Sequence, residues 1–128
     1  MASKDGRETA LAFSQYLLEK KAKEIKILDF LGKSSFADFF IIATVESNPQ
    51  AQAAADHLIR SVKNDLHLTP HHREGEYKIS SWLIIDYIDI VVHLFMPEER
   101  KRYDLEKLWH EAEMIDVIDE EPGINGNN

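Results

Sequence analysis

Trp82-Leu-Ile-Ile-Asp86 and Asp89-Ile-Val-Val-His-Leu-Phe-Met96 are the two stretches that decide the fold, because both are rich in β-branched residues and nearly adjoin. Only Tyr87 and Ile88 separate them, which is the spacing of a β-hairpin. A Tyr-Ile pair is poor chemistry for a two-residue turn, which usually contains Gly or Asn. The sequence therefore predicts a pair of antiparallel strands joined by an unusual turn.

The rest of the chain alternates between helical and strand patterns. Apolar residues recur about once per helical turn in some segments, and alternate or run continuously in others. Helices are expected at residues 8–22, 47–66 and 105–109, with a helical turn at 97–98, and strands at 24–30, 39–45 and 71–74. Together with the hairpin, this order predicts a single-domain α/β protein in which helices pack on a mixed sheet of about five strands.

The composition restricts what the protein can do. Its 128 residues suit one domain, and its formal net charge of −8 gives an acidic surface that repels phosphate backbones. Direct nucleic-acid binding is therefore not expected, whereas a basic protein partner is favoured. The chain has no cysteine, no visible secretory signal and no apolar run long enough to span a membrane, so we expect a cytoplasmic protein.

Two motifs that could carry nucleotide chemistry are incomplete. Gly32-Lys33-Ser34 has the end of a P-loop, but Ile27 stands where that motif needs its first glycine. Asp38 follows a Gly/Ser turn as in nucleotidyltransferases, but Phe40 occupies the position of the second carboxylate. A lone carboxylate cannot hold the metal ions of phosphoryl transfer, so no catalytic residue and no cofactor is expected. A nucleotide-handling enzyme remains the alternative.

The histidines lack the spacing of a metal site. His67 and His71 lie on either side of a helix break at Pro70, and the neighbours His71 and His72 point to opposite faces of a strand. We therefore expect no metal site. His93 lies in the second hairpin strand and is expected to be half-buried and hydrogen-bonded.

The aromatic residues are the best candidates for partner contact. Trp109 follows Leu108 in a short helical pattern and is expected in the core. Trp82 opens a strand close to Asp86 and Asp89, and it suits a core position and a partner anchor equally well, since aromatic residues are enriched at interface hot spots.

The C-terminal part of the chain has a different composition. Six acidic residues and no basic one lie between Glu111 and Glu121, and residues 122–128 are rich in Gly and Asn. We expect a folded domain at residues 7–110, followed by a largely disordered acidic tail at 111–128.

Short segments in a fixed order also resemble the ribosomal silencing factor family, called RsfS or Iojap-like. They are Lys20-Lys-Ala22, Ile27-Leu-Asp29, Asp38-Phe-Phe-Ile-Ile-Ala43, Ser47 with Gln50, Ala55-Asp-His57, Glu74-Gly75, Trp82-Leu-Ile-Ile-Asp86, Asp89-Ile-Val-Val-His93, Arg102-Tyr-Asp-Leu-Glu106 and Leu108-Trp109. The resemblance runs from about Arg7 to His110.

This resemblance implies a nucleotidyltransferase-like shape without the catalytic carboxylates, and a protein that is not an enzyme. It implies binding to the large-subunit ribosomal protein numbered fourteen, where it would block joining of the small subunit, and possible homodimers. We expect the partner-binding residues to be Trp82 as anchor, Asp86, Asp89 and Glu74 as acidic contacts, and Arg102 and Tyr103 at the rim.

One position departs from the family pattern. The family usually has glycine just before the second aspartate of the hairpin, and this chain has Ile88 there. Because isoleucine disfavours positive φ, we expect a longer turn or a turn of another type.

Overall fold

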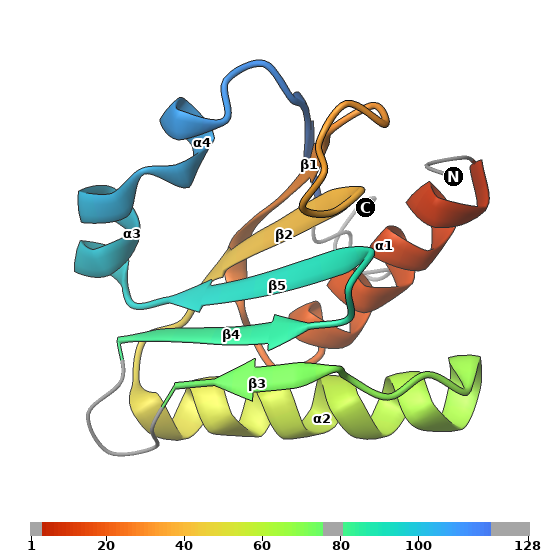
Figure 1. Cartoon of the computed structure of the whole chain (residues 1–128). Helices are drawn as coiled ribbons and strands as arrows, with labels where there is room; N and C mark the ends of the chain where they lie inside the picture. The colour runs from red at the N-terminus through yellow and green to blue at the C-terminus, as the bar shows by residue number, and fades with distance from the viewer. Residues whose placement is uncertain (1–3, 76–80, 119–128) are drawn as a thin grey trace, which may run out of the picture.

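The structure is a computed structural model that describes residues 4–75 and 81–118 (Figure 1). Its helices and strands follow the order expected from the sequence up to α4, an unexpected strand β6 comes after them, and the chain forms one α/β domain. The elements are α1 (Lys4–Leu18), β1 (Lys23–Asp29), β2 (Phe39–Thr44), α2 (Asn48–Leu66), β3 (His72–Glu74), β4 (Trp82–Asp86), β5 (Ile90–Phe95), α3 (Pro97–Tyr103), α4 (Leu105–Leu108) and β6 (Glu113–Asp116).

The strands form one mixed sheet in the order β3-β4-β5-β2-β1-β6. Only β2 and β5, at the centre, run parallel, and the other neighbours are antiparallel. The predicted hairpin is confirmed as β4 and β5, with Ile85 paired to Val92. The mixed α/β architecture is therefore confirmed, although the sheet has six strands rather than about five.

The two faces of the sheet are covered differently. Helices α1 and α2 lie together against one face, where the fully buried side chains of Phe13 and Leu58 join those of Ile41 and Leu83 in the main core. Among the described residues, the short helices α3 and α4 lie over the other face, next to a smaller apolar cluster around Leu28, Ile42, Phe95 and Leu105. The part of this second face that α3 and α4 do not cover is therefore available for contact with a partner.

The first helix ends earlier than its apolar period suggested. The pattern predicted a helix over residues 8–22, but α1 ends at Leu18. Lys21 has φ +69°, and the amides of Lys21 and Ala22 bond to the carbonyls of Leu18 and Leu17. These two bonds form a Schellman motif with lysine where glycine is usual, so the apolar Ala22 packs on the core after the helix has ended.

The predicted start of the second helix is confirmed. The Ser47 hydroxyl accepts a hydrogen bond from the Gln50 amide at 3.2 Å, and Pro49 lies in the first turn. The helix ends at His67, which has φ +60° and donates its amide to the Lys63 carbonyl. His67 is thus the C-terminal cap of α2.

The expectation of a disordered tail from Glu111 onward is wrong for part of that segment. Strand β6 pairs with β1, with Ile115 opposite Ile27 and Glu113 opposite Asp29. Arg7 of α1 bridges the carboxylates of Asp29 and Glu113, which offsets the acidity of this edge. Residues 119–128 of the expected tail lie outside the described residues.

The longer helices are amphipathic rather than apolar all round. Within the described residues, no helix combines the length and the apolar character needed to cross a membrane.

Candidate partner-binding face

The uncovered part of the sheet lies on β3, β4 and β5. Residues directly opposite each other on neighbouring strands point to the same side, so the strand pairing identifies its members. Glu74 pairs with Ile84, which pairs with His93, and His72 pairs with Asp86, which pairs with Val91. We call these residues, together with Trp82 at one end, the open face: His72, Glu74, Trp82, Ile84, Asp86, Val91 and His93.

Trp82 contributes to both the fold and the surface. Its ring is half-buried and stacks on Phe95 at a centroid distance of 4.8 Å. Tyr103, at the end of α3, lies 4.5 Å from the same ring and is 46% exposed. Of the two interpretations that the sequence left open, the structure therefore makes Trp82 a packed residue that still presents part of its ring to solvent.

His93 forms the buried floor of the open face. It is only 5% exposed, and its Nδ1 accepts a hydrogen bond from the Trp82 indole at 3.1 Å. Among the described residues its Nε2 finds no hydrogen-bond partner, and the centroid of the Phe40 ring lies 4.5 Å from that of the imidazole. The sequence predicted a half-buried, hydrogen-bonded histidine; the prediction was wrong about burial, and only one of the two ring nitrogens is bonded.

Burial determines the charge of His93. The apolar surroundings lower the pKa of the imidazole to about 4, and the attraction of Asp86 opposes this only weakly. The ring is therefore neutral at pH 7. Because Nδ1 accepts a bond, the proton is assigned to Nε2.

The turn between β4 and β5 contradicts the expectation for Ile88. Its φ is +76°, and the Asp89 amide bonds to the Tyr87 carbonyl at 2.9 Å, which makes a tight γ-turn of the rare left-handed form. Asp86 accepts the Ile88 amide at 2.7 Å through Oδ1 and helps to hold the turn. Isoleucine thus adopts the conformation that was expected to need glycine.

The six sequence-predicted residues do not all meet. Glu74, Trp82 and Asp86 lie on the open face, and Tyr103 borders it through its contact with Trp82. Asp89 lies in the turn beyond the strands.

Arg102 is also separate from the open face. Its side chain is 71% exposed and pairs at 3.7 Å with Glu99 within α3. The structure therefore places four of the six predicted residues on or beside the open face, whereas the Arg102 side chain pairs within α3 instead.

Sequence reasoning missed the apolar floor between these groups. Ile84 and Val91 are half-buried on the open face, and Phe40 of β2 adjoins His93. The signal was present in the period of two along each strand, which places Ile84 on the side of Trp82 and Asp86.

Arg100 fixes the helices that border the open face. Its guanidinium donates to the Thr44 hydroxyl at 2.8 Å, to the Glu106 carboxylate at 2.9 Å and to the Glu24 carbonyl. The side chain is only 10% exposed. It therefore ties α3 and α4 to β1 and β2. No short sequence motif predicted this role.

The position where a nucleotidyltransferase would carry its second carboxylate is aromatic. The Phe40 ring lies 5.0 Å from Phe30 and 6.0 Å from Trp109. Asp38 bonds through its amide to the Asp89 carbonyl. Within residues 4–75 and 81–118, no three His, Asp or Glu side chains gather in a way that could hold a metal ion.

Comparisons with known proteins agree on one group. A family model described as "Ribosomal silencing factor during starvation" matches residues 3–127. The ribosomal silencing factor RsfS of Halalkalibacterium halodurans is 38% identical over 99 residues, which cover 77% of this chain and 83% of that protein. A mouse protein named "Mitochondrial assembly of ribosomal large subunit protein 1" is 28% identical over 94 residues, which cover 73% of this chain and 41% of that protein.

A crystal structure has a similar fold. A protein from Chromobacterium violaceum superposes with a TM-score of 0.75 and 28% identity, over 88% of this chain and 92% of that chain.

Proposed function

The chain belongs to the ribosomal silencing factor family, and from this premise we propose that it represses translation by binding the large ribosomal subunit and blocking the small subunit sterically. The name of the mouse relative, which refers to the large ribosomal subunit, supports the choice of subunit. The partner that we propose is the ribosomal protein numbered fourteen. We place the protein in the cytoplasm, where ribosomes work. We also propose that it forms homodimers, which sedimentation measurements would detect.

The open face is the observation that carries this proposal. An apolar floor of Ile84 and Val91 lies between the acidic Glu74 and Asp86 and the aromatic Trp82. Aromatic anchors supply short-range binding energy, and charged rims direct encounter with a partner of opposite charge. A protein of net charge −8 with such a face suits a basic ribosomal protein.

The proposed mechanism needs no chemical turnover. The relatives are named as silencing factors rather than as enzymes. Phe40, packed among aromatic rings, stands at the position where the nucleotidyltransferase pattern that begins at Asp38 would need its second carboxylate. Occupancy of the subunit interface would be sufficient for repression.

A subunit-joining assay tests the proposal. The parent protein should co-sediment with purified large subunits and reduce their association with small subunits. Ile84→Lys, which places a charge in the middle of the open face, should abolish both effects. Leu11→Lys, an equal change at a 43% exposed residue of α1 against the other sheet face, should abolish neither. Normal binding by Ile84→Lys with unchanged folding would disprove the choice of face.

A further inference from the structure

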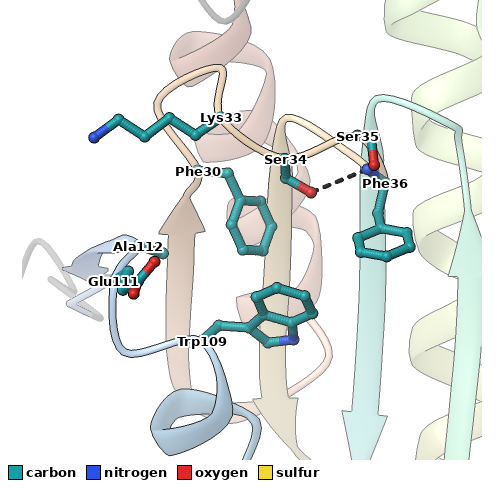
Figure 2. A pocket seen from close by; sticks show the side chains of 8 residues that line it. All are labelled: Phe30, Lys33, Ser34, Ser35, Phe36, Trp109, Glu111 and Ala112. Atoms are coloured by element: carbon teal, nitrogen blue, oxygen red, sulfur yellow. Dashed lines mark hydrogen bonds between the residues drawn. The ribbon is translucent and has the colours of Figure 1, made fainter.

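A pocket of about 220 Å³ opens between the loop that joins β1 to β2 and the segment that follows α4 (Figure 2). The rings of Phe30 and Phe36 lie 5.3 and 5.9 Å from Trp109 and form its apolar walls. Lys33 and Glu111 stand at its edge, and Figure 2 shows the amine of Lys33 directed away from the rings. We call this hollow the aromatic pocket.

Apolar side chains exposed to solvent lie on and beside the segments that form the aromatic pocket. Phe36 is 70% exposed, Leu31 before it in the loop is 49% exposed, and Leu108 at the end of α4 is 64% exposed. Single exposed apolar residues are ordinary, but a group of them around a hollow marks an interaction site.

The loop that forms one wall is held in place by its own hydrogen bonds. Leu31 and Gly32 both have positive φ, at +58° and +75°. The Leu31 amide bonds to the buried Asp29 carboxylate at 2.8 Å, and the Phe36 amide bonds to the Ser34 hydroxyl at 3.0 Å. A preformed wall lowers the ordering cost of binding, which favours affinity.

We propose that the aromatic pocket receives one large apolar side chain, aromatic or leucine-sized, from a protein partner. Its volume is below the roughly 300–1,000 Å³ of pockets for small-molecule ligands and suits a single side chain. The rings provide apolar walls against which such an anchor would be desolvated on binding, where anchors contribute most. This site is separate from the open face and was not among the residues expected from the sequence.

The partner that fills the aromatic pocket is the one that docks on the open face. Both sites lie on the same side of the sheet and are joined by rings in sequence. Trp109 is 6.0 Å from Phe40, Phe40 is 4.5 Å from His93, and His93 bonds to Trp82. The identity of this partner rests on the proposed function, whereas the chemistry of the pocket does not.

Charge indicates which residues flank the anchor. Glu111 is exposed at the edge of the pocket and forms no ion pair with any residue in the described ranges. On a chain of net charge −8, this carboxylate suits a lysine or arginine beside the apolar anchor. The occupant is thus an apolar side chain within a basic protein segment.

The first measurement compares two truncations of exposed apolar side chains. Phe36→Ala should weaken binding to purified large subunits at least about ten-fold and leave the melting temperature unchanged. Leu11→Ala, on the helix against the opposite face, should change neither quantity. Glu111→Lys should weaken binding more at low salt than at high salt, and Glu8→Lys on α1 should not. Parent-like binding by Phe36→Ala overturns the proposal.

A second measurement makes the pocket testable without ribosomes. N-acetyl-phenylalaninamide, titrated against the full chain, should shift the amide resonances of Ser34, Phe36 and Trp109 saturably. Phe36→Ala should lose these shifts, whereas Leu11→Ala should keep them. If the parent fails to bind large subunits but shows these shifts, the proposed function fails and the pocket assignment stands. If no saturable shift is seen, the pocket assignment is overturned.

Discussion

The indole nitrogen of Trp82 donates a hydrogen bond to Nδ1 of His93, 3.1 Å away, and so places the imidazole proton on the other nitrogen. A second proton could enter the ring only at Nδ1, where it would break this bond. The pair therefore links the exposed anchor of the open face to a buried titratable group. Protonation of His93 at low pH should therefore change the environment of both side chains.

The free energy of unfolding should decrease on acidification, over a pH range set by the folded-state and unfolded-state pKa values of His93. The folded protein keeps the pKa of this imidazole at about 4, whereas the unfolded chain takes up the proton near 6.5. Between these values the unfolded state binds more protons, so the free energy of unfolding decreases as the pH falls from 6.5 toward 4.

His93→Asn, which keeps an acceptor for the indole but cannot titrate, isolates this effect. Between pH 7.5 and pH 5 the parent should lose about 2 kcal/mol more stability than the variant in urea unfolding. Equal losses in the two proteins would show that protonation of His93 does not lower the free energy of unfolding.

Trp82 should show separable effects on folding and on binding. Trp82→Phe keeps a ring against Phe95 and Tyr103 but removes the hydrogen bond to His93, and should cost about 1 kcal/mol of stability. Trp82→Ala also removes the ring and should cost about 3 kcal/mol. If the exposed part of the ring is the anchor, Trp82→Phe should accelerate dissociation from large subunits while the protein stays folded. Unchanged dissociation would confine Trp82 to a packing role.

Ile88→Gly should stabilise the protein. A β-branched residue at φ +76° carries strain of about 1–3 kcal/mol, and glycine removes it at a smaller entropic cost. We expect a gain of about 1 kcal/mol in the free energy of unfolding. Ala53→Gly, at an exposed position within α2, should instead lose about 1 kcal/mol. A loss in both variants would mean that the γ-turn is not strained.

Arg100→Gln should loosen α3 and α4. The change leaves the half-buried Glu106 carboxylate and the Thr44 hydroxyl without their cationic partner and should cost about 3 kcal/mol. Lys101→Gln, at the exposed neighbouring position, should cost less than about 0.5 kcal/mol. Faster amide exchange in α3 and α4 of Arg100→Gln would locate the loss. Exchange that is faster throughout the chain would contradict this local role.

Asp86→Asn tests the acidic rim without disturbing the turn. Its amide oxygen can still accept the Ile88 amide, which an arginine at this position could not do. Loss of the charge should slow association with large subunits several-fold at low salt and have little effect at high salt. Glu8→Gln on α1 removes an equal charge from the other side and should not slow association. Equal rates for both variants would remove Asp86 from the encounter surface.

Local patterns predicted the parts of the fold that depend on local chemistry. The β4–β5 hairpin follows from its alternating apolar residues, and the start of α2 follows from the spacing of Ser47 and Gln50. In both cases, residues close along the chain carry the information. Trp109 was expected in the core, but it is only partly buried beside Phe30 and Phe40.

The features that were missed depend on residues far apart in sequence. Strand β6 is short and acidic at both ends, and its pairing relies on backbone bonds to β1 and on the bridge from Arg7. Ile88 adopts positive φ because Asp86 and Asp89 hold the turn around it. The aromatic pocket combines Phe36 with Trp109, which no spacing rule connects.

The strand pairings also constrain the order in which the protein can fold as it is made. Lys26 of β1 pairs with Ile42 on one side and with Asp116 on the other. The central parallel pair joins Ile42 to His93, across the whole of α2 and the β3–β4 segment. A ribosome must therefore have released most of the chain before the sheet can close, and β1 presents an unpaired edge until β6 arrives.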